Sequence, residues 1–78
     1  MPVLLRIRAI KFYIYSLEED RPHVHVKVKS FIFKIWLDNV TLEKSNAPSF
    51  LENKVLKLVK LHKNELLESW HGYFGNKK

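Results

Sequence analysis

Two different spacings of hydrophobic residues divide the chain into two halves. Over residues 3–38, apolar and polar residues alternate, which is the period of strands that have one buried face and one solvated face. Between residues 49 and 74, apolar residues recur every three or four positions, which is the period of an amphipathic helix. The pattern therefore predicts one α+β domain, residues 1–78, whose β half precedes its helical half.

The alternating half predicts a small antiparallel meander of four strands. These strands span about residues 3–8, 11–16, 23–29 and 31–38. Short connections at Ala9–Ile10 and Ser30 favour antiparallel pairing of neighbouring strands. The acidic segment Leu17–Pro22 is typical of a loop, because its proline cannot donate a ladder hydrogen bond. Residues 41–48 are expected to form a linker or a short extended piece.

The second half predicts a C-terminal amphipathic helix that covers one face of the sheet. Ser49 stands three residues before Glu52, which is the spacing of a capping box, so the helix should begin near residue 50. It should run to about residue 74, either in one piece or with a break near Leu61–Asn64. Gly75 is expected as the C-cap, with residues 76–78 as a tail.

Sorting each strand by alternation gives the sheet an apolar face and a basic, aromatic face. The apolar face packs on the helix, and the opposite face should be open to solvent. Its expected cations are Arg6, Arg8, Lys11, Lys27, Lys29 and Lys34. Its expected rings are Tyr13, Tyr15, Trp36, His23 and His25, with Asp38 as the one acid. Cations interleaved with rings suit single-stranded RNA, although similar faces also occur on sheets that bind nothing.

Composition bears on the partner and on the compartment. A net charge of +6 and a pI near 9.7 favour an anionic partner, either nucleic acid or an acidic protein, over solubility alone. The absence of cysteine excludes disulfides, thiol nucleophiles and cysteine-based zinc sites. No apolar run reaches the ~18 residues of a membrane-spanning helix, and the N-terminus lacks the pattern of a secretory signal. We therefore expect a cytoplasmic protein that does not bind a membrane.

The segment Arg21–Lys29, RPHVHVKVK, leaves three interpretations of its two histidines open. In the first, His23 and His25 bind a metal with Asp38 or an acid of residues 18–20, but neighbouring lysines would repel the ion, so we predict neither metal nor cofactor. In the second, they transfer protons in a metal-independent ribonuclease. In the third, they are polar strand residues, or binding residues without chemistry.

A ribonuclease of this kind needs a base, an acid and cations, and the predicted face carries all three. The candidate catalytic residues are His23, His25, Tyr13 and Tyr15. The candidate nucleic-acid-binding residues are Arg6, Arg8, Lys27, Lys29 and Lys34, which would hold phosphates, and Trp36, which would stack on a base.

Four runs of sequence are distinctive and follow one another along nearly the whole chain: "VLLRI", "KFYIYSLEEDRPHVHV", "KIWLDNV" and "ELLESWHGYF". In these runs and in their order, the chain resembles the bacterial family known as domain of unknown function 4160. The chain departs from the family at "RAIK", where members tend to carry a glycine turn, and at "KSF", where members tend to have a longer hairpin. The resemblance implies a bacterial cytosolic protein, the candidate toxin of a toxin–antitoxin pair whose partner belongs to domain of unknown function 2442.

Together these observations give two hypotheses about function. The first is a toxin that acts on RNA, as a metal-independent ribonuclease, and that an acidic antitoxin-like protein inactivates by covering the basic face. The alternative is a non-enzymatic module that binds protein or nucleic acid. The sequence favours no particular oligomeric state.

Overall fold

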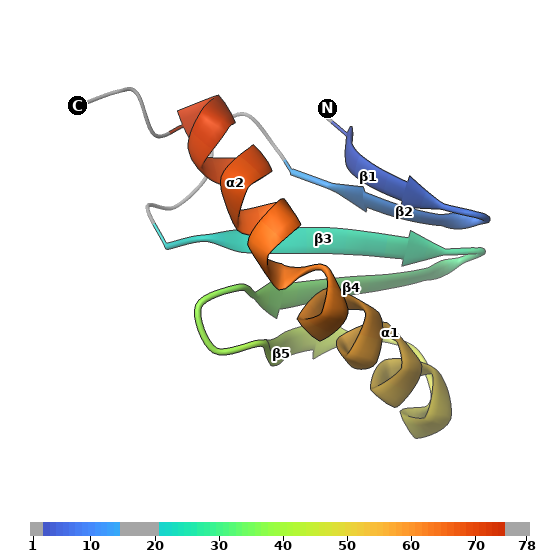
Figure 1. Ribbon diagram of the computed structural model, residues 1–78. Coiled ribbons are helices and arrows are strands. Elements are labelled where there is room, and N and C mark those ends of the chain that lie inside the picture. The colour runs from blue at the N-terminus through green and yellow to red at the C-terminus, as the bar shows by residue number, and fades with distance from the viewer. Residues whose placement is uncertain (1–2, 15–20, 75–78) are drawn as a thin grey trace.

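Five antiparallel strands and two helices make up the fold in a computed structural model, which describes residues 3–14 and 21–74 (Figure 1). The elements are β1 (Val3–Ile7), β2 (Ile10–Tyr13), β3 (His23–Val28), β4 (Phe31–Trp36), β5 (Thr41–Ser45), α1 (Ser49–Leu61) and α2 (Lys63–Phe74). Each strand pairs with its neighbour in sequence, in the order β1-β2-β3-β4-β5. The α+β class and the antiparallel meander are confirmed.

The prediction of four strands is wrong, because residues 41–45 form a fifth strand instead of a linker. β5 pairs with β4 at the edge of the sheet, with Leu42 opposite Ile35 and Thr41 opposite Trp36. The segment TLEKS contains one apolar residue, Leu42, which packs against the core, and its other side chains are polar. An edge strand with a single inward apolar residue shows no alternation, so the hydrophobic pattern could not reveal it.

All four predicted strands extend too far at their C-terminal ends, since β2 also ends at Tyr13, before Ile14. Arg8 and Lys29 have φ angles of 54° and 56° and lie in the tight turns after β1 and β3. A positive φ cannot continue a strand, so these two cations leave the sheet at its end. β4 likewise ends at Trp36, and the turn that follows contains Val40 with a φ of 50°. Residues 15 and 16, predicted as the end of the second strand, lie outside the described residues.

The hydrophobic core lies between the sheet and the helices, as the alternation predicts. Its fully buried residues in the β half are Phe12, Ile14, Val24, Val26, Phe33, Ile35 and Leu37, and its buried helix residues are Val55, Val59, Leu66 and Trp70. Ile14 and Leu37 directly follow β2 and β4. Each large apolar side chain buried in this way contributes about 1.5–3 kcal/mol. Strict alternation over residues 3–8 would place Val3 on the inward face with Leu5 and Ile7, but this expectation is wrong for Val3. The register of β1 is irregular between Val3 and Leu5, Val3 is 44% exposed, and Leu4 packs against the core.

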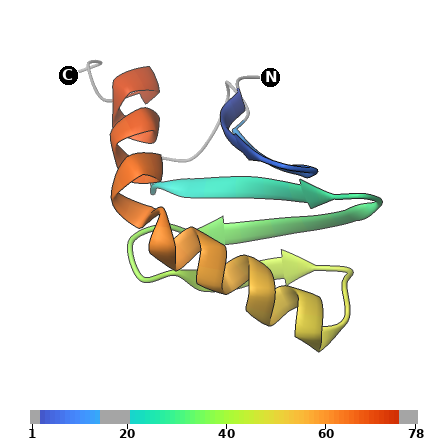
Figure 2. The ribbon, with the colours of Figure 1, turned by 45° about the vertical axis from the view of Figure 1, so that its right-hand side comes forward.

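The helical half is divided at His62. α1 contacts β5 and α2 contacts β1, so the two helices cover different parts of the same sheet face (Figure 2). The capping box is not formed: Pro48 is the N-cap, and its carbonyl accepts hydrogen bonds of 3.0 Å from the backbone N–H groups of Leu51 and Glu52. The expected C-cap, Gly75, lies outside the described residues. Within the described ranges, neither helix has the length and apolar content that a membrane span requires.

Candidate nucleic-acid interface

A row of four rings crosses the sheet face opposite the helices. Strand register pairs Tyr13 with His25 across β2 and β3, and His23 with Trp36 across β3 and β4. Tyr13 and His25 stack with ring centroids 5.5 Å apart and an interplanar angle of 24°. His23 meets His25 at 5.4 Å and Trp36 at 5.5 Å, both edge to face. We call Tyr13, His25, His23 and Trp36 the ring row, and its existence confirms that these residues share one face.

The ring row is less open to solvent than the sequence predicts. Tyr13 is 4% exposed and His23 is 0% exposed, whereas His25 and Trp36 are half-buried. Neighbouring side chains supply part of this cover, since the rings pack on one another and Lys11 Nζ lies 5.4 Å from the Tyr13 ring centroid. The expectation of a fully solvated face is therefore wrong at Tyr13 and His23, and His25 and Trp36 are the rings of the row that a ligand can contact.

His23 is held in one orientation by the backbone. Its Nδ1 lies 2.8 Å from the Arg21 carbonyl oxygen. A carbonyl oxygen only accepts, so Nδ1 must carry the hydrogen and donate it. In the neutral ring Nε2 is then the unprotonated nitrogen. His23 is fully buried, and its Nδ1 is engaged in this hydrogen bond. His23 is therefore suited to hold the rings of His25 and Trp36 in position.

Three charged residues hold the Trp36 ring in position. Arg21 Cζ lies 4.2 Å and Lys34 Nζ 4.9 Å from the ring centroid, and the indole Nε1 donates a hydrogen bond of 2.8 Å to Glu43 Oε1. Arg21 also donates to both carboxylate oxygens of Asp38, at 2.8 and 3.0 Å. These hydrogen bonds are the largest cause of an Asp38 pKa below its ordinary value. Arg21 and Glu43 were not predicted as site residues, because the first was assigned to the loop Leu17–Pro22 and the second lies on the strand that the pattern missed.

Three cations lie side by side across the neighbouring part of the same face. Arg6 is opposite Lys11, and Lys11 is opposite Lys27, on three adjacent strands. With Ala9 and Lys29 they line a shallow hollow of about 300 Å³. Like charges directly opposite one another destabilise a sheet unless an anion or solvent screens them. None of the described residues that line the hollow is acidic, so its chemistry suits a phosphate group.

The remaining predicted residues lie at the margins of this arrangement. Lys34 is opposite His25 on β4, so a cation stands beside the half-buried histidine. Arg8 is exposed in the β1–β2 turn, beyond the end of the paired strands. Tyr15, a predicted catalytic residue, lies outside the described ranges. The acids of residues 18–20, which were considered as metal ligands, lie outside them as well. Asp38, the other candidate ligand, is paired with Arg21, and no group of three or more metal-binding side chains occurs in the part of the chain that the structure describes.

Comparison with known proteins gives one match. The family model described as "Domain of unknown function (DUF4160)" matches residues 9–71, a range that contains the ring row, most of the hollow and nearly all of both helices. No curated protein and no solved structure matches the chain.

Proposed function

The chain belongs to the DUF4160 family, and from the ring row and the cations beside it we propose that this family member binds single-stranded RNA on the sheet face opposite its helices. The observation that carries the proposal is the combination of two rings that a ligand can reach, His25 and Trp36, with a basic hollow on the same face. Bases stack on rings, and phosphates pair with cations, so the face offers both contacts that a single strand needs.

The spacing of the two sets of groups fits a nucleotide chain. Lys11 and Lys27 precede and follow Tyr13 and His25 by two residues along β2 and β3, a separation of about 7 Å on one face. A base that stacks at the ring row can therefore leave its adjacent phosphate near the hollow. Trp36 is preorganised for stacking, because Arg21, Lys34 and Glu43 hold its ring in place before any ligand binds.

The chemistry that we propose at this face is metal-independent RNA cleavage. His25 takes the proton from a ribose 2′-hydroxyl, the 2′-oxygen attacks phosphorus, and the 5′-oxygen leaves with a proton from a second group. The products are a 2′,3′-cyclic phosphate and a 5′-hydroxyl. Tyr15 is the candidate for that second group, because Tyr13 is 4% exposed and its ring stacks on His25, where it serves to position that ring. Lys34 would stabilise the charge on the phosphorane. His23 acts through His25, as a positioning residue.

In the cell we propose that this activity is that of a toxin, restrained by an acidic antitoxin-like protein. The family resemblance implies this role, and the excess of positive charge on the sheet face supports an acidic partner. Inducing wild-type chain should then arrest growth, whereas His25→Ala should not. Growth arrest by both chains, or by neither, would contradict the proposal of a histidine-dependent toxin.

The direct test is incubation of pure protein with end-labelled single-stranded RNA in the presence of a chelator. We expect wild type to bind and cleave, His25→Ala to bind without cleaving, and Trp36→Ala to bind at least about fivefold more weakly, since one stacked base contributes about 1–3 kcal/mol. Lys54→Ala, an exposed residue of α1, is the matched control and should behave as wild type. Failure of wild type to bind RNA would refute the proposal.

A second candidate function, RNA binding without cleavage, is supported by the burial of His23. With Nδ1 donating to Arg21 and the ring fully buried, the described part of the row leaves His25 as the one imidazole that a ligand reaches. Binding by wild type with intact RNA after prolonged incubation would favour this candidate over the ribonuclease.

A further inference from the structure

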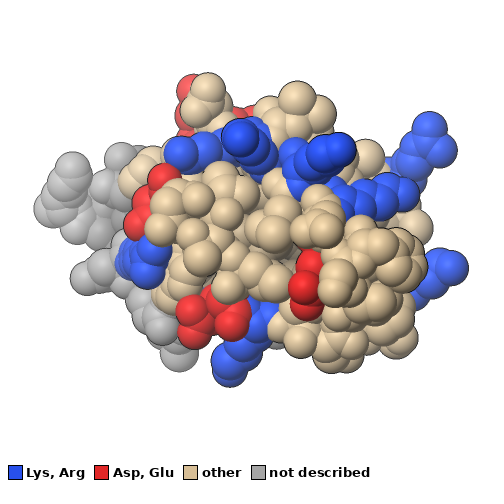
Figure 3. All heavy atoms as spheres, turned by 90° about the horizontal axis from the view of Figure 1, so that it is seen from below, with Lys and Arg blue, Asp and Glu red and all other residues tan. Residues whose placement is uncertain are grey.

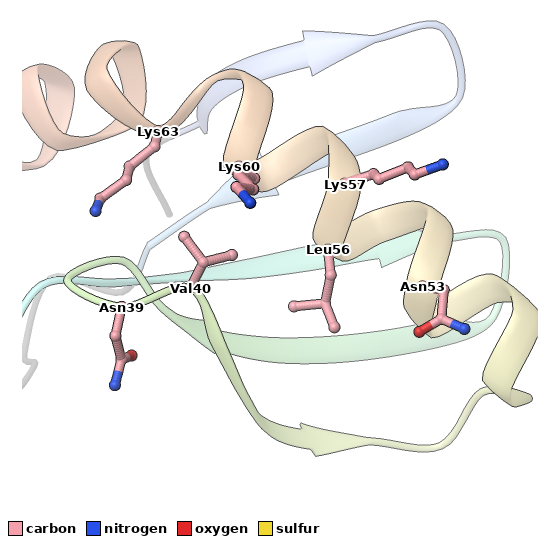
Figure 4. Close-up of a pocket in the computed structure, with 7 residues that line it drawn as sticks. All are labelled: Asn39, Val40, Asn53, Leu56, Lys57, Lys60 and Lys63. Atoms are coloured by element: carbon pink, nitrogen blue, oxygen red, sulfur yellow. The ribbon is translucent and has the colours of Figure 1, made fainter.

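A groove on the helical side of the molecule has no part in the RNA-binding proposal. Its volume is about 670 Å³, and it lies between α1 and the turn that joins β4 to β5 (Figure 4). The lining residues are Asn39, Val40, Asn53, Leu56, Lys57, Lys60 and Lys63. Because the helices cover the opposite face of the sheet from the ring row, a ligand in this groove would not touch RNA on the other face.

The groove combines an apolar wall with positive charge. Leu56 and Val40 point toward the space between α1 and the turn, and both also pack against the core (Figure 4). Lys57, Lys60 and Lys63 spread along the helical side, and Figure 3 shows a band of Lys and Arg side chains along the upper edge of the molecule. This arrangement is amphipathic, so its ligand should be amphipathic and negatively charged.

The carboxylate of Asp38, whose backbone Lys63 contacts, is engaged elsewhere. Lys63 Nζ donates a hydrogen bond of 3.1 Å to the backbone carbonyl of Asp38, while the Asp38 carboxylate is engaged by Arg21. None of the described lining residues is Asp or Glu. The positive charge of the groove is therefore available to an anionic ligand.

The dimensions and side chains favour a peptide over a nucleic acid. Asn53, Leu56 and Lys60 follow one stripe of α1, which spans about 10 Å and matches about three residues of extended chain, and Lys63 lies at the start of α2 beyond it. None of the described lining residues is aromatic, so bases have no ring on which to stack, in contrast to the ring row. The side-chain amides of Asn39 and Asn53 can pair with peptide groups.

The backbone conformation of Val40 also supports a role for its side chain in the groove. Its φ of 50° lies in the left-handed region, which a β-branched residue rarely adopts and which glycine or asparagine would occupy with less strain. A strained residue of this kind persists where its side chain is needed, and here that side chain forms both a core contact and the wall of the groove.

We propose that this groove binds a short acidic segment of a partner protein. One apolar side chain of the segment packs between Leu56 and Val40, and flanking carboxylates pair with Lys57, Lys60 and Lys63. The inference does not rest on RNA binding, and the peptide and an RNA strand would bind to opposite faces of the sheet at the same time.

The test is fluorescence anisotropy of the full chain with a labelled peptide in which one leucine is flanked by two glutamates on each side. Lys57→Glu/Lys60→Glu should weaken binding at least about tenfold, because each exposed ion pair contributes a factor of about two to five and reversal replaces attraction by repulsion. Lys44→Glu/Lys54→Glu changes net charge equally outside the groove and should weaken binding less than about threefold. Val40→Gly should lower affinity while far-ultraviolet circular dichroism shows a folded chain.

Three results would overturn the proposal. The first is equal weakening by the two double variants, and the second is equal affinity for a peptide with glutamine in place of glutamate. The third is displacement of the labelled peptide by single-stranded RNA in wild type but not in Trp36→Ala, which would assign the peptide to the sheet face. Loss of RNA binding alone leaves the peptide result intact, so the two proposals fail separately.

Discussion

His23 is the residue on which the geometry of the ring row depends. It contacts His25 on one side and Trp36 on the other, and it donates from Nδ1 to the Arg21 carbonyl oxygen, while Arg21 itself stacks on Trp36. One buried imidazole therefore joins the backbone before β3 to both rings that a ligand can reach. Its contribution should be to stability and orientation, and that of His25 to contact with the ligand.

Substitution separates these roles. His23→Ala should lower the free energy of unfolding by about 1–3 kcal/mol, because it leaves a cavity and removes the partner of the Arg21 carbonyl. His25→Ala, at a half-buried position, should lower it by less than about 1 kcal/mol. Urea denaturation measures both values, and an equal loss in the two variants would contradict the assignment of His23 as the structural residue.

Asp38 gives the fold an acid-dependent contribution. Arg21 lowers the pKa of Asp38 in the folded chain, so the folded state binds that proton less readily than the unfolded state. The stabilisation is present above the unfolded pKa and is lost as pH falls through the folded pKa. The urea midpoints of wild type and Asp38→Asn should therefore differ most near neutral pH and converge below about pH 4. A gap that stays unchanged as the pH falls well below the unfolded pKa of Asp38 would show that the Arg21 ion pair contributes nothing.

At the scale of elements, hydrophobic alternation predicted the central strands well and the edges poorly. Phe33, Ile35 and Leu37 are all buried, as their spacing requires, because a strand that crosses the middle of the core has one face wholly apolar. At the edges a single inward residue is enough: Leu42 anchors β5, and the shifted register at Val3 changes which residue of β1 turns inward. A two-residue period in the sequence reveals neither the short edge strand β5 nor the shift at Val3.

The ring row was predictable in its membership and not in its packing. Alternation placed His23, His25 and Trp36 on one face, and strand register brings them together. It could not show that His23 would be buried, because burial depends on how long side chains fold over one another. Arg21 and Glu43 enter the site through contacts across 15 and 7 residues of sequence, which no local pattern reports.

The tight turn after β3 allows a test of its backbone conformation. Lys29 is exposed and has a φ of 56°, so Lys29→Gly should raise the free energy of unfolding by about 0.5–1 kcal/mol by relieving left-handed strain. Lys27, equally exposed but within β3, is the matched control, and Lys27→Gly should lower stability by a similar amount. Destabilisation by Lys29→Gly would mean that its side chain holds the hairpin together.

The whole molecule presents positive charge on both sides of one sheet, with different companions on each side. On one side the cations stand beside rings, and on the other they stand beside Leu56 and Val40. A net charge of +6 attracts any anion from a distance, so affinity alone does not identify which ligand belongs to which side. The salt dependence of binding identifies the side on which RNA binds, because it counts the cations that a bound strand neutralises.

Six cations were assigned to the RNA-binding face, and single-stranded RNA that contacts all of them should show a slope of about −4 in log affinity against log salt concentration. Replacing Arg6, Lys11 and Lys27 by glutamine removes three of these charges, so the slope should fall to about −2.

Two control variants test whether the slope reports the sheet face. Trp36→Ala should lower affinity at every salt concentration without changing the slope, because stacking releases no counterions. Lys57→Glu/Lys60→Glu should leave the slope near its wild-type value if RNA binds to the sheet face alone. A slope that drops with the groove variant instead would mean that the strand wraps around to the helical side, and a flat response in wild type would remove RNA as the ligand.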